Sequence, residues 1–129
     1  MKSMNLLLEA QKIKRDIVQF RRNFHMHPEL GMEEYRTVSI IEDTLKSLGV
    51  ETKRIAGTGV IGLLKGKNPG KTIGLRADMD ALPILEKNKV PYASKIPGKM
   101  HACGHDAHKD YLKFGKIFYL RTFRNKRDI

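Results

Sequence analysis

One cysteine in 129 residues excludes an internal disulfide framework, because such a framework needs pairs of cysteines. The thiol of Cys103 could be a buried small hydrophobe, a reactive group or a metal ligand. The sequence also lacks any run of about 18 apolar residues, which argues against a membrane span. Internal repeats and low-complexity segments are absent as well, so the composition is that of one ordinary globular domain.

The first residues lack the apolar core that marks a secretory signal. Residues 1–5 lead directly into an amphipathic pattern that includes Glu9, Lys12 and Lys14. We therefore expect a cytoplasmic protein that does not enter a membrane.

Acidic residues are few relative to basic ones, and the formal net charge is +11. The excess is concentrated in residues 109–129, where seven Lys or Arg and two Asp give a net +5. Five aromatic residues are interleaved with the basic ones in this segment, as in some nucleic-acid-binding tails. A solvated helix face is the simpler interpretation, so nucleic acid is the less favoured partner.

Two amphipathic helices are predicted in the N-terminal half. Over residues 5–24 apolar side chains recur at helical spacing, and the helix should end before Pro28 because the residue before a proline avoids the helical region. Over residues 33–48 a second apolar stripe is followed by Gly49, which is well placed as a C-terminal cap.

Three strands and a long loop are predicted after the helices. Residues 50–55 and 60–65 flank a glycine-rich turn, and residues 72–77 form a short apolar run typical of an interior strand. The order helix, helix, strand, strand, strand predicts an α/β layered domain. Prolines and a glycine make residues 83–100 an irregular loop, and residues 107–123 could be helical.

Three of the five histidines fall within eight consecutive residues, together with a cysteine and an aspartate. Imidazole, thiolate and carboxylate groups are common ligands of zinc and similar metals, and Gly104 lets the backbone turn so that Cys103 and His105 can point to one centre. Two ligands are too few for a tetrahedral site, so Asp106 or His108 could be a further ligand or the group that orients one. The alternative is a histidine-rich surface loop with Cys103 buried and inert.

A second polar group, Asp78 and Asp80, follows the strand predicted at residues 72–77. Ligands gather at this end of the strands in α/β sheets, and residues two apart project to the same side of an extended backbone. Two such carboxylates repel unless a cation, an arginine or a shared proton intervenes. Metal binding is one interpretation of the pair, and a solvated turn with Asp78 paired to Arg76 is the other.

Together the two motifs resemble a known enzyme family. Residues 74–84 (GLRADMDALPI), 97–100 (PGKM) and 101–108 (HACGHDAH) are similar to the N-acyl-amino-acid amidohydrolases, the hippurate hydrolase and auxin-conjugate hydrolase branch of the zinc aminoacylase and carboxypeptidase family. Residues 21–31 (RRNFHMHPELG), followed by Glu34 and Thr37, resemble the same branch. The resemblance runs from about residue 10 to residue 108.

The resemblance implies an α/β catalytic domain of three layers, helix–sheet–helix with a mixed sheet, as in zinc aminopeptidases. It also implies a centre of two divalent metal ions (Zn, Mn, Co or Ni), with Cys103 and His105 as ligands. Asp80 matches the aspartate that supports catalysis by orienting a ligand, whereas Asp78 stands where the wider family usually has a histidine ligand. The implied activity is hydrolysis of the amide bond of N-acyl amino acids or small peptides by a metal-bound water, with a glutamate as general base.

The family pattern breaks after His108. A helix of small residues, a Pro-Ala-Glu-Glu-like motif with the general base, two further histidine ligands and a second domain would follow, whereas residues 109–129 are bulky and basic. We therefore expect residues 1–108 to be the N-terminal part of the catalytic domain and residues 109–129 to be a divergent tail from a truncation or frameshift. Such a chain should be inactive alone, with weak metal binding and an open sheet edge that favours a homo-oligomer. The alternative function is a non-catalytic remnant that binds a partner.

Overall fold

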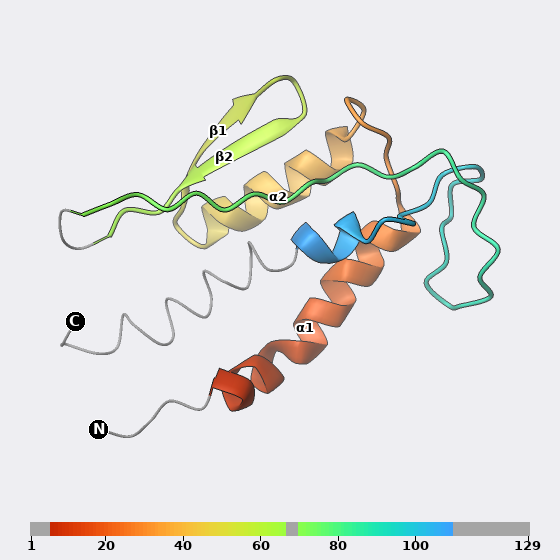
Figure 1. The fold of residues 1–129 in the computed structure, drawn as a ribbon, viewed down its shortest axis with the longest axis horizontal. Helices are drawn as coiled ribbons and strands as arrows, with labels where there is room; N and C mark the ends of the chain where they lie inside the picture. The colour runs from red at the N-terminus through yellow and green to blue at the C-terminus, as the bar shows by residue number, and fades with distance from the viewer. Residues whose placement is uncertain (1–5, 67–69, 110–129) are drawn as a thin grey trace.

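The computed structural model describes residues 6–66 and 70–109. Four elements follow one another: helix α1 (Leu6–Met26), helix α2 (Tyr35–Ser47), strand β1 (Glu51–Ile55) and strand β2 (Gly59–Leu63). Figure 1 shows α2 beside the β1–β2 hairpin, and residues 70–104 run as a loop to a short helix at residues 105–109. Helices and a sheet in one chain confirm the predicted α/β class.

Both predicted helices are confirmed, and α1 continues through Met26, slightly beyond its expected end. The C-terminus of α2 is closed by a Schellman motif. In this motif Gly49 N–H donates to Lys46 O at 2.8 Å and Val50 N–H donates to Leu45 O at 3.0 Å. Gly49 has a φ of 72°, a conformation that costs glycine little, so its predicted role as a cap is confirmed.

The strands β1 and β2 pair antiparallel in a two-stranded sheet, with Lys53 opposite Ile61 at the centre. They confirm the two strands predicted in this region, with slightly different bounds. The hairpin packs closely on the end of α2. A Cβ added at Gly62 would lie 3.0 Å from Val50 Cγ1 and 3.4 Å from Leu45 Cδ1, so a larger residue would require these two side chains to shift.

The buried apolar side chains come from both helices and from two later segments. They are Ile13, Phe24, Val38, Ile41, Val50 and Ala81. Ala81 is fixed by backbone pairing, since its N–H donates to Glu29 O at 2.7 Å and it forms a parallel bridge with Leu30. The turn that follows α1 therefore sets the position of the Asp78–Asp80 segment.

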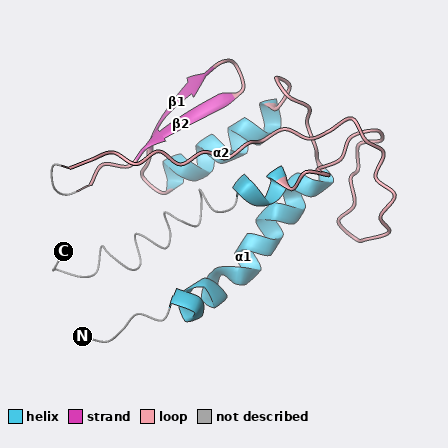
Figure 2. Cartoon of the chain, in the orientation of Figure 1, coloured by secondary structure: helices cyan, strands magenta, loops and turns pink. Residues whose placement is uncertain are grey.

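The interior strand predicted at residues 72–77 is not a strand in this chain. These residues belong to no sheet in the described part of the chain, and Figure 2 draws them as loop. Ile73 and Leu75, which an interior strand would bury, are 84% and 71% exposed. A strand requires a neighbour whose N–H and C=O groups complete its ladder, and an apolar run alone supplies none.

The irregular loop predicted at residues 83–100 is confirmed. It is closed at its base because Leu82 N–H donates to Met100 O at 2.9 Å and Met100 N–H donates to Leu82 O at 3.0 Å. The helix predicted at residues 107–123 begins at residue 105, and its part from residue 110 lies outside the described residues. No helix in the described part of the chain is long and apolar enough to cross a membrane.

Candidate metal centre

Asp80 and His105, which come from the two separate motifs, are in direct contact. His105 Nδ1 lies 2.8 Å from Asp80 Oδ1 and 3.1 Å from the Asp80 carbonyl oxygen. Because a carboxylate and a carbonyl only accept hydrogen bonds, Nδ1 carries the proton and donates it. In the neutral ring Nε2 then keeps a free lone pair, the arrangement usual for a metal-binding histidine. The structure therefore brings two of the predicted site residues together.

Asp78 is held partly by the arginine that precedes it. Its Oδ1 accepts a hydrogen bond from Arg76 Nε at 2.8 Å, so the simpler alternative, a pair between Asp78 and Arg76, is present. The other oxygen, Oδ2, lies 4.0 Å from Nε2 of His105. Asp78 thus stands beside the nitrogen that is available to a metal, without contacting it.

Cys103 is exposed, which rules out the alternative of a buried and inert thiol. Gly104, between Cys103 and His105, has a φ of 88° and provides the predicted backbone turn. Among residues 6–66 and 70–109, no group of three or more His, Cys, Asp or Glu side chains is arranged to hold a metal ion. An exposed thiolate and an oriented imidazole suit a transition metal, but further ligands are needed to complete a tetrahedral site.

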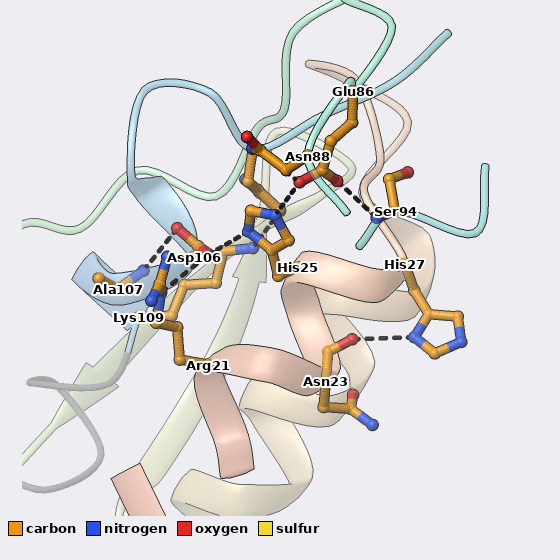
Figure 3. Close-up of polar contacts among 11 residues, drawn as sticks. Arg21, Asn23, His25, His27, Glu86, Asn88, Ser94, Asp106, Ala107 and Lys109 are labelled. Atoms are coloured by element: carbon orange, nitrogen blue, oxygen red, sulfur yellow. Dashed lines mark hydrogen bonds and ion pairs between the residues drawn. The ribbon is translucent and has the colours of Figure 1, made fainter. Parts of the chain in front are cut away.

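Of the two candidate additional ligands, Asp106 is turned away from the predicted centre. It is fully buried and directed at α1, where it contacts Arg21 and His25 (Figure 3), so a ligand role for Asp106 is wrong for this structure. A role in orienting the ligands stays open for it. His108 is exposed, and its ring centroid lies 5.3 Å from that of His105.

Two residues that were not predicted as site residues, His25 and Glu86, meet Asp106 in a buried polar network. His25 lies within the stretch 21–31 that carries part of the family resemblance, which was the available signal. Glu86 lies in an irregular loop, where no periodic pattern marks a buried side chain. Burial opposes ionisation of Glu86, but hydrogen bonds from Ser94 N–H, His25 and Asn88 outweigh it and lower the pKa of this carboxyl.

His101 and Lys109 form a second buried pair next to the candidate centre. Lys109 Nζ donates to His101 Nε2 at 3.2 Å and lies 4.4 Å from the centroid of the Phe24 ring. Burial, and after it the nearby charge of Lys109, lowers the pKa of His101 from 6.5 to about 4. His101 is therefore neutral at neutral pH, as a ring that accepts a hydrogen bond from an ammonium group must be.

Comparison with known proteins agrees with the geometry. Residues 74–127 match the model of peptidase family M20/M25/M40. The N-acyl-L-amino acid amidohydrolase of Geobacillus stearothermophilus is 48% identical over 104 residues, which are 80% of this chain and 28% of that protein. The hippurate hydrolase of Campylobacter jejuni is 46% identical over 110 residues, 84% of this chain and 29% of that protein.

A solved structure shares the fold. The crystal structure of the Bacillus subtilis YxeP protein, described as a dinuclear metal binding peptidase from the M20 family, superposes with a TM-score of 0.79 at 38% identity. The match covers 86% of this chain and 32% of that structure, so the chain spans less than a third of the length of each of these relatives. Over the residues that match, the chain is therefore similar to peptidase family M20/M25/M40 and to amidohydrolase and peptidase enzymes.

Proposed function

We propose that Cys103 and His105 are metal ligands, and that Asp80 orients His105, in an enzyme that hydrolyses the amide bond of N-acyl amino acids or small peptides. The observation that carries the proposal is the 2.8 Å contact between His105 Nδ1 and Asp80 Oδ1. It joins two motifs that are 25 residues apart, and it leaves the outer nitrogen of the ring free. The substrate class follows from the names of the amidohydrolase relatives.

The residues of this chain would contribute in distinct ways. Asp80 accepts the Nδ1 proton of His105, which fixes the tautomer and the direction of the ring. Cys103 supplies a thiolate from an exposed position, and Gly104 sets its direction relative to His105. A divalent ion held there would lower the pKa of a coordinated water and polarise the substrate carbonyl. Zinc, manganese, cobalt and nickel all suit these donors, and a pair of ions is proposed from likeness to the dinuclear neighbour.

We further propose that residues 1–108 form the N-terminal part of a catalytic domain in a cytoplasmic enzyme. The general base and the remaining ligands would then come from the rest of the parent enzyme. In support, this chain spans less than a third of the length of its relatives. The tail boundary at residue 109 stays a prediction, since residues 110–129 lie outside the described part of the chain and the family match runs on to residue 127.

Release of benzoate from N-benzoylglycine, and of acetate from N-acetyl amino acids, tests the proposal. Assays with added manganese, zinc, cobalt or nickel should show turnover by the full-length parent and none by the 129-residue chain. In the parent, Asp80→Asn should lower kcat/KM about 10–100-fold, because His105 loses the carboxylate that orients it. Asp43→Asn, at an exposed site on α2, is the matched control and should leave activity unchanged. Robust turnover by this chain alone, or an unaffected Asp80→Asn enzyme, would contradict the proposal.

A second candidate function is a non-catalytic module that associates with another copy or a partner. The observation in its favour is the exposure of Ile73 and Leu75, apolar side chains of a segment that belongs to no sheet in the described part of the chain. A nucleic-acid role is the third candidate and rests on composition alone. It predicts binding with a steep salt dependence that disappears when residues 109–129 are deleted.

A further inference from the structure

The carboxylate of Asp106 is buried and fully engaged, directly beside His105. It has no exposed surface. Its Oδ2 accepts hydrogen bonds from His25 Nδ1 at 2.8 Å and from Arg21 Nε at 3.0 Å, and its Oδ1 accepts one from Ala107 N–H at 3.1 Å. Both donors of the first oxygen come from α1, so Asp106 fastens the start of the helix at residues 105–109 to α1 (Figure 3).

His25 extends this contact to a third segment of the chain. Its second nitrogen, Nε2, lies 3.1 Å from Glu86 Oε1, and both side chains are almost completely buried, at 6% and 4% exposure. Each ring nitrogen of His25 therefore faces a carboxylate, and both can donate only in the doubly protonated ring. Glu86 is in turn held by Ser94 N–H and Asn88 Nδ2 of its own loop.

Buried carboxylates are tolerated when hydrogen bonds and a cation satisfy them. This network meets that condition, because Arg21 is a cationic partner of Asp106 and the His25 ring places one nitrogen against each of the two carboxylates, Asp106 and Glu86. It ties together α1, the loop at residues 83–100 and the segment that carries Cys103 and His105.

We infer that Asp106 is a positioning residue, which through Arg21 and His25 sets the direction of Cys103 and His105 relative to Asp80. The inference rests on the proposed function, in which Cys103 and His105 bind a metal. A single peptide bond separates Asp106 from His105, so movement of the buried carboxylate moves the imidazole. Metal affinity is sensitive to such movement, because groups that orient the ligands typically change affinity 10–100-fold when removed.

Cobalt titration of the 129-residue chain tests the inference, since a Cys103 thiolate bound to Co²⁺ gives a charge-transfer absorption band. Cys103→Ser should abolish the band. Asp106→Asn should weaken Co²⁺ binding about 100-fold, and Arg21→Met about 10-fold. Arg21 is partly exposed, at 41%, so its variant is expected to fold even if the aspartate variant does not. Arg21→Lys keeps a cationic donor and should restore most of the affinity.

Glu42→Gln is the matched control. Glu42 pairs with Arg54 at 2.6 Å and with Lys46 at 2.9 Å on α2, away from the ligand segment. Its loss should change the thermal midpoint without changing Co²⁺ affinity by more than about twofold. All titrations are done well below the thermal midpoints, so that a purely structural role would leave the affinity unchanged.

The outcomes separate the two claims. Absence of the band in the unsubstituted chain would overturn the proposed metal ligands, and the positioning role with them. A normal band with unchanged affinity in folded Arg21→Met and Asp106→Asn chains would overturn the positioning role alone. Weakened binding in Arg21→Met that Arg21→Lys restores, with no change in Glu42→Gln, is the result that the inference predicts.

Discussion

Glu29 caps helix α2 from outside the helix. Its Oε1 accepts a hydrogen bond from Arg36 N–H at 3.0 Å and its Oε2 accepts one from Thr37 N–H at 2.7 Å. These are two of the N–H groups that the first turn of a helix leaves without partners, and the negative charge also lies at the positive end of the helix dipole. Glu34, at the N-cap position itself, makes no such bond, so the distant carboxylate replaces a conventional cap.

The Glu29 cap leads to a stability prediction. Glu29→Ala should lower the free energy of unfolding by about 1–2 kcal/mol, because both N–H groups lose their acceptor. Urea denaturation followed by circular dichroism measures this. Glu33→Ala is the control, since Glu33 is exposed and pairs with Lys99 at 3.3 Å in solvent, and it should change stability by less than about 0.5 kcal/mol. Equal effects of the two substitutions would contradict the capping role.

Glu86 gives a second prediction at this scale, concerning pH. The groups that face it are His25 of α1 and, from its own loop, Ser94 N–H and Asn88. Although burial opposes ionisation, these contacts hold its pKa below 4.5 in the folded chain. A lowered carboxyl pKa contributes stability that is fully present above 4.5 and is lost as the pH falls through the folded-state pKa.

Glu86→Gln should therefore lower the free energy of unfolding at pH 7 by about 1–3 kcal/mol, the range for a hydrogen-bonded charged group. The difference between the two chains should shrink as the pH is lowered below 4.5, because the carboxyl becomes protonated in the original chain as well. Urea denaturation at a series of pH values measures the difference. A constant difference down to about pH 3 would be inconsistent with an ionised Glu86 in the folded state.

At the scale of elements, the segment at residues 72–77 differs most from its expected form. Its composition is that of an interior strand, yet Ile73 and Leu75 face solvent and the segment pairs with no strand in the described part of the chain. Exposed apolar side chains on extended backbone favour association with a second strand. The open sheet edge predicted from the sequence is not formed by these residues, because they are not a strand; what the structure shows is an exposed apolar segment.

Leu75→Lys tests this exposure. The substitution should change the free energy of unfolding by less than about 0.5 kcal/mol, because little apolar surface at this position is removed from water. It should also reduce any self-association seen by light scattering, since a charge on an edge segment opposes pairing. Leu7→Lys, at a similarly exposed position on α1, controls for the added charge. A loss of several kcal/mol for Leu75→Lys would mean that the side chain is buried after all.

At the scale of the whole molecule, local signals were sufficient for the regular elements. The apolar stripes of α1 and α2, the glycine at position 49 and the turn between β1 and β2 each act over a few residues, and each prediction is confirmed. The strand at residues 72–77 could not be predicted correctly in the same way. Whether an extended apolar run becomes a strand depends on a partner, which a local pattern does not contain.

The candidate centre, too, could be predicted from the sequence only in part. Residue types marked the two motifs, and the family resemblance selected Asp80, Cys103 and His105 within them; the structure places Asp80 and His105 in contact. The partners of Asp106 could not be found in this way, because His25 lies 81 residues away from it and carries no spacing signal. Buried polar partners are fixed by tertiary packing, so a sequence pattern names the ligands more readily than the groups that hold them in place.

X-ray absorption at the zinc edge of the zinc-loaded chain tests the central claim most directly. Cys103 and His105 as ligands predict one sulfur at about 2.3 Å and at least one nitrogen at about 2.0–2.1 Å from the metal. The sulfur contribution should disappear in Cys103→Ser. A spectrum of the unsubstituted chain that contains only oxygen and nitrogen neighbours would contradict the assignment of Cys103 as a ligand.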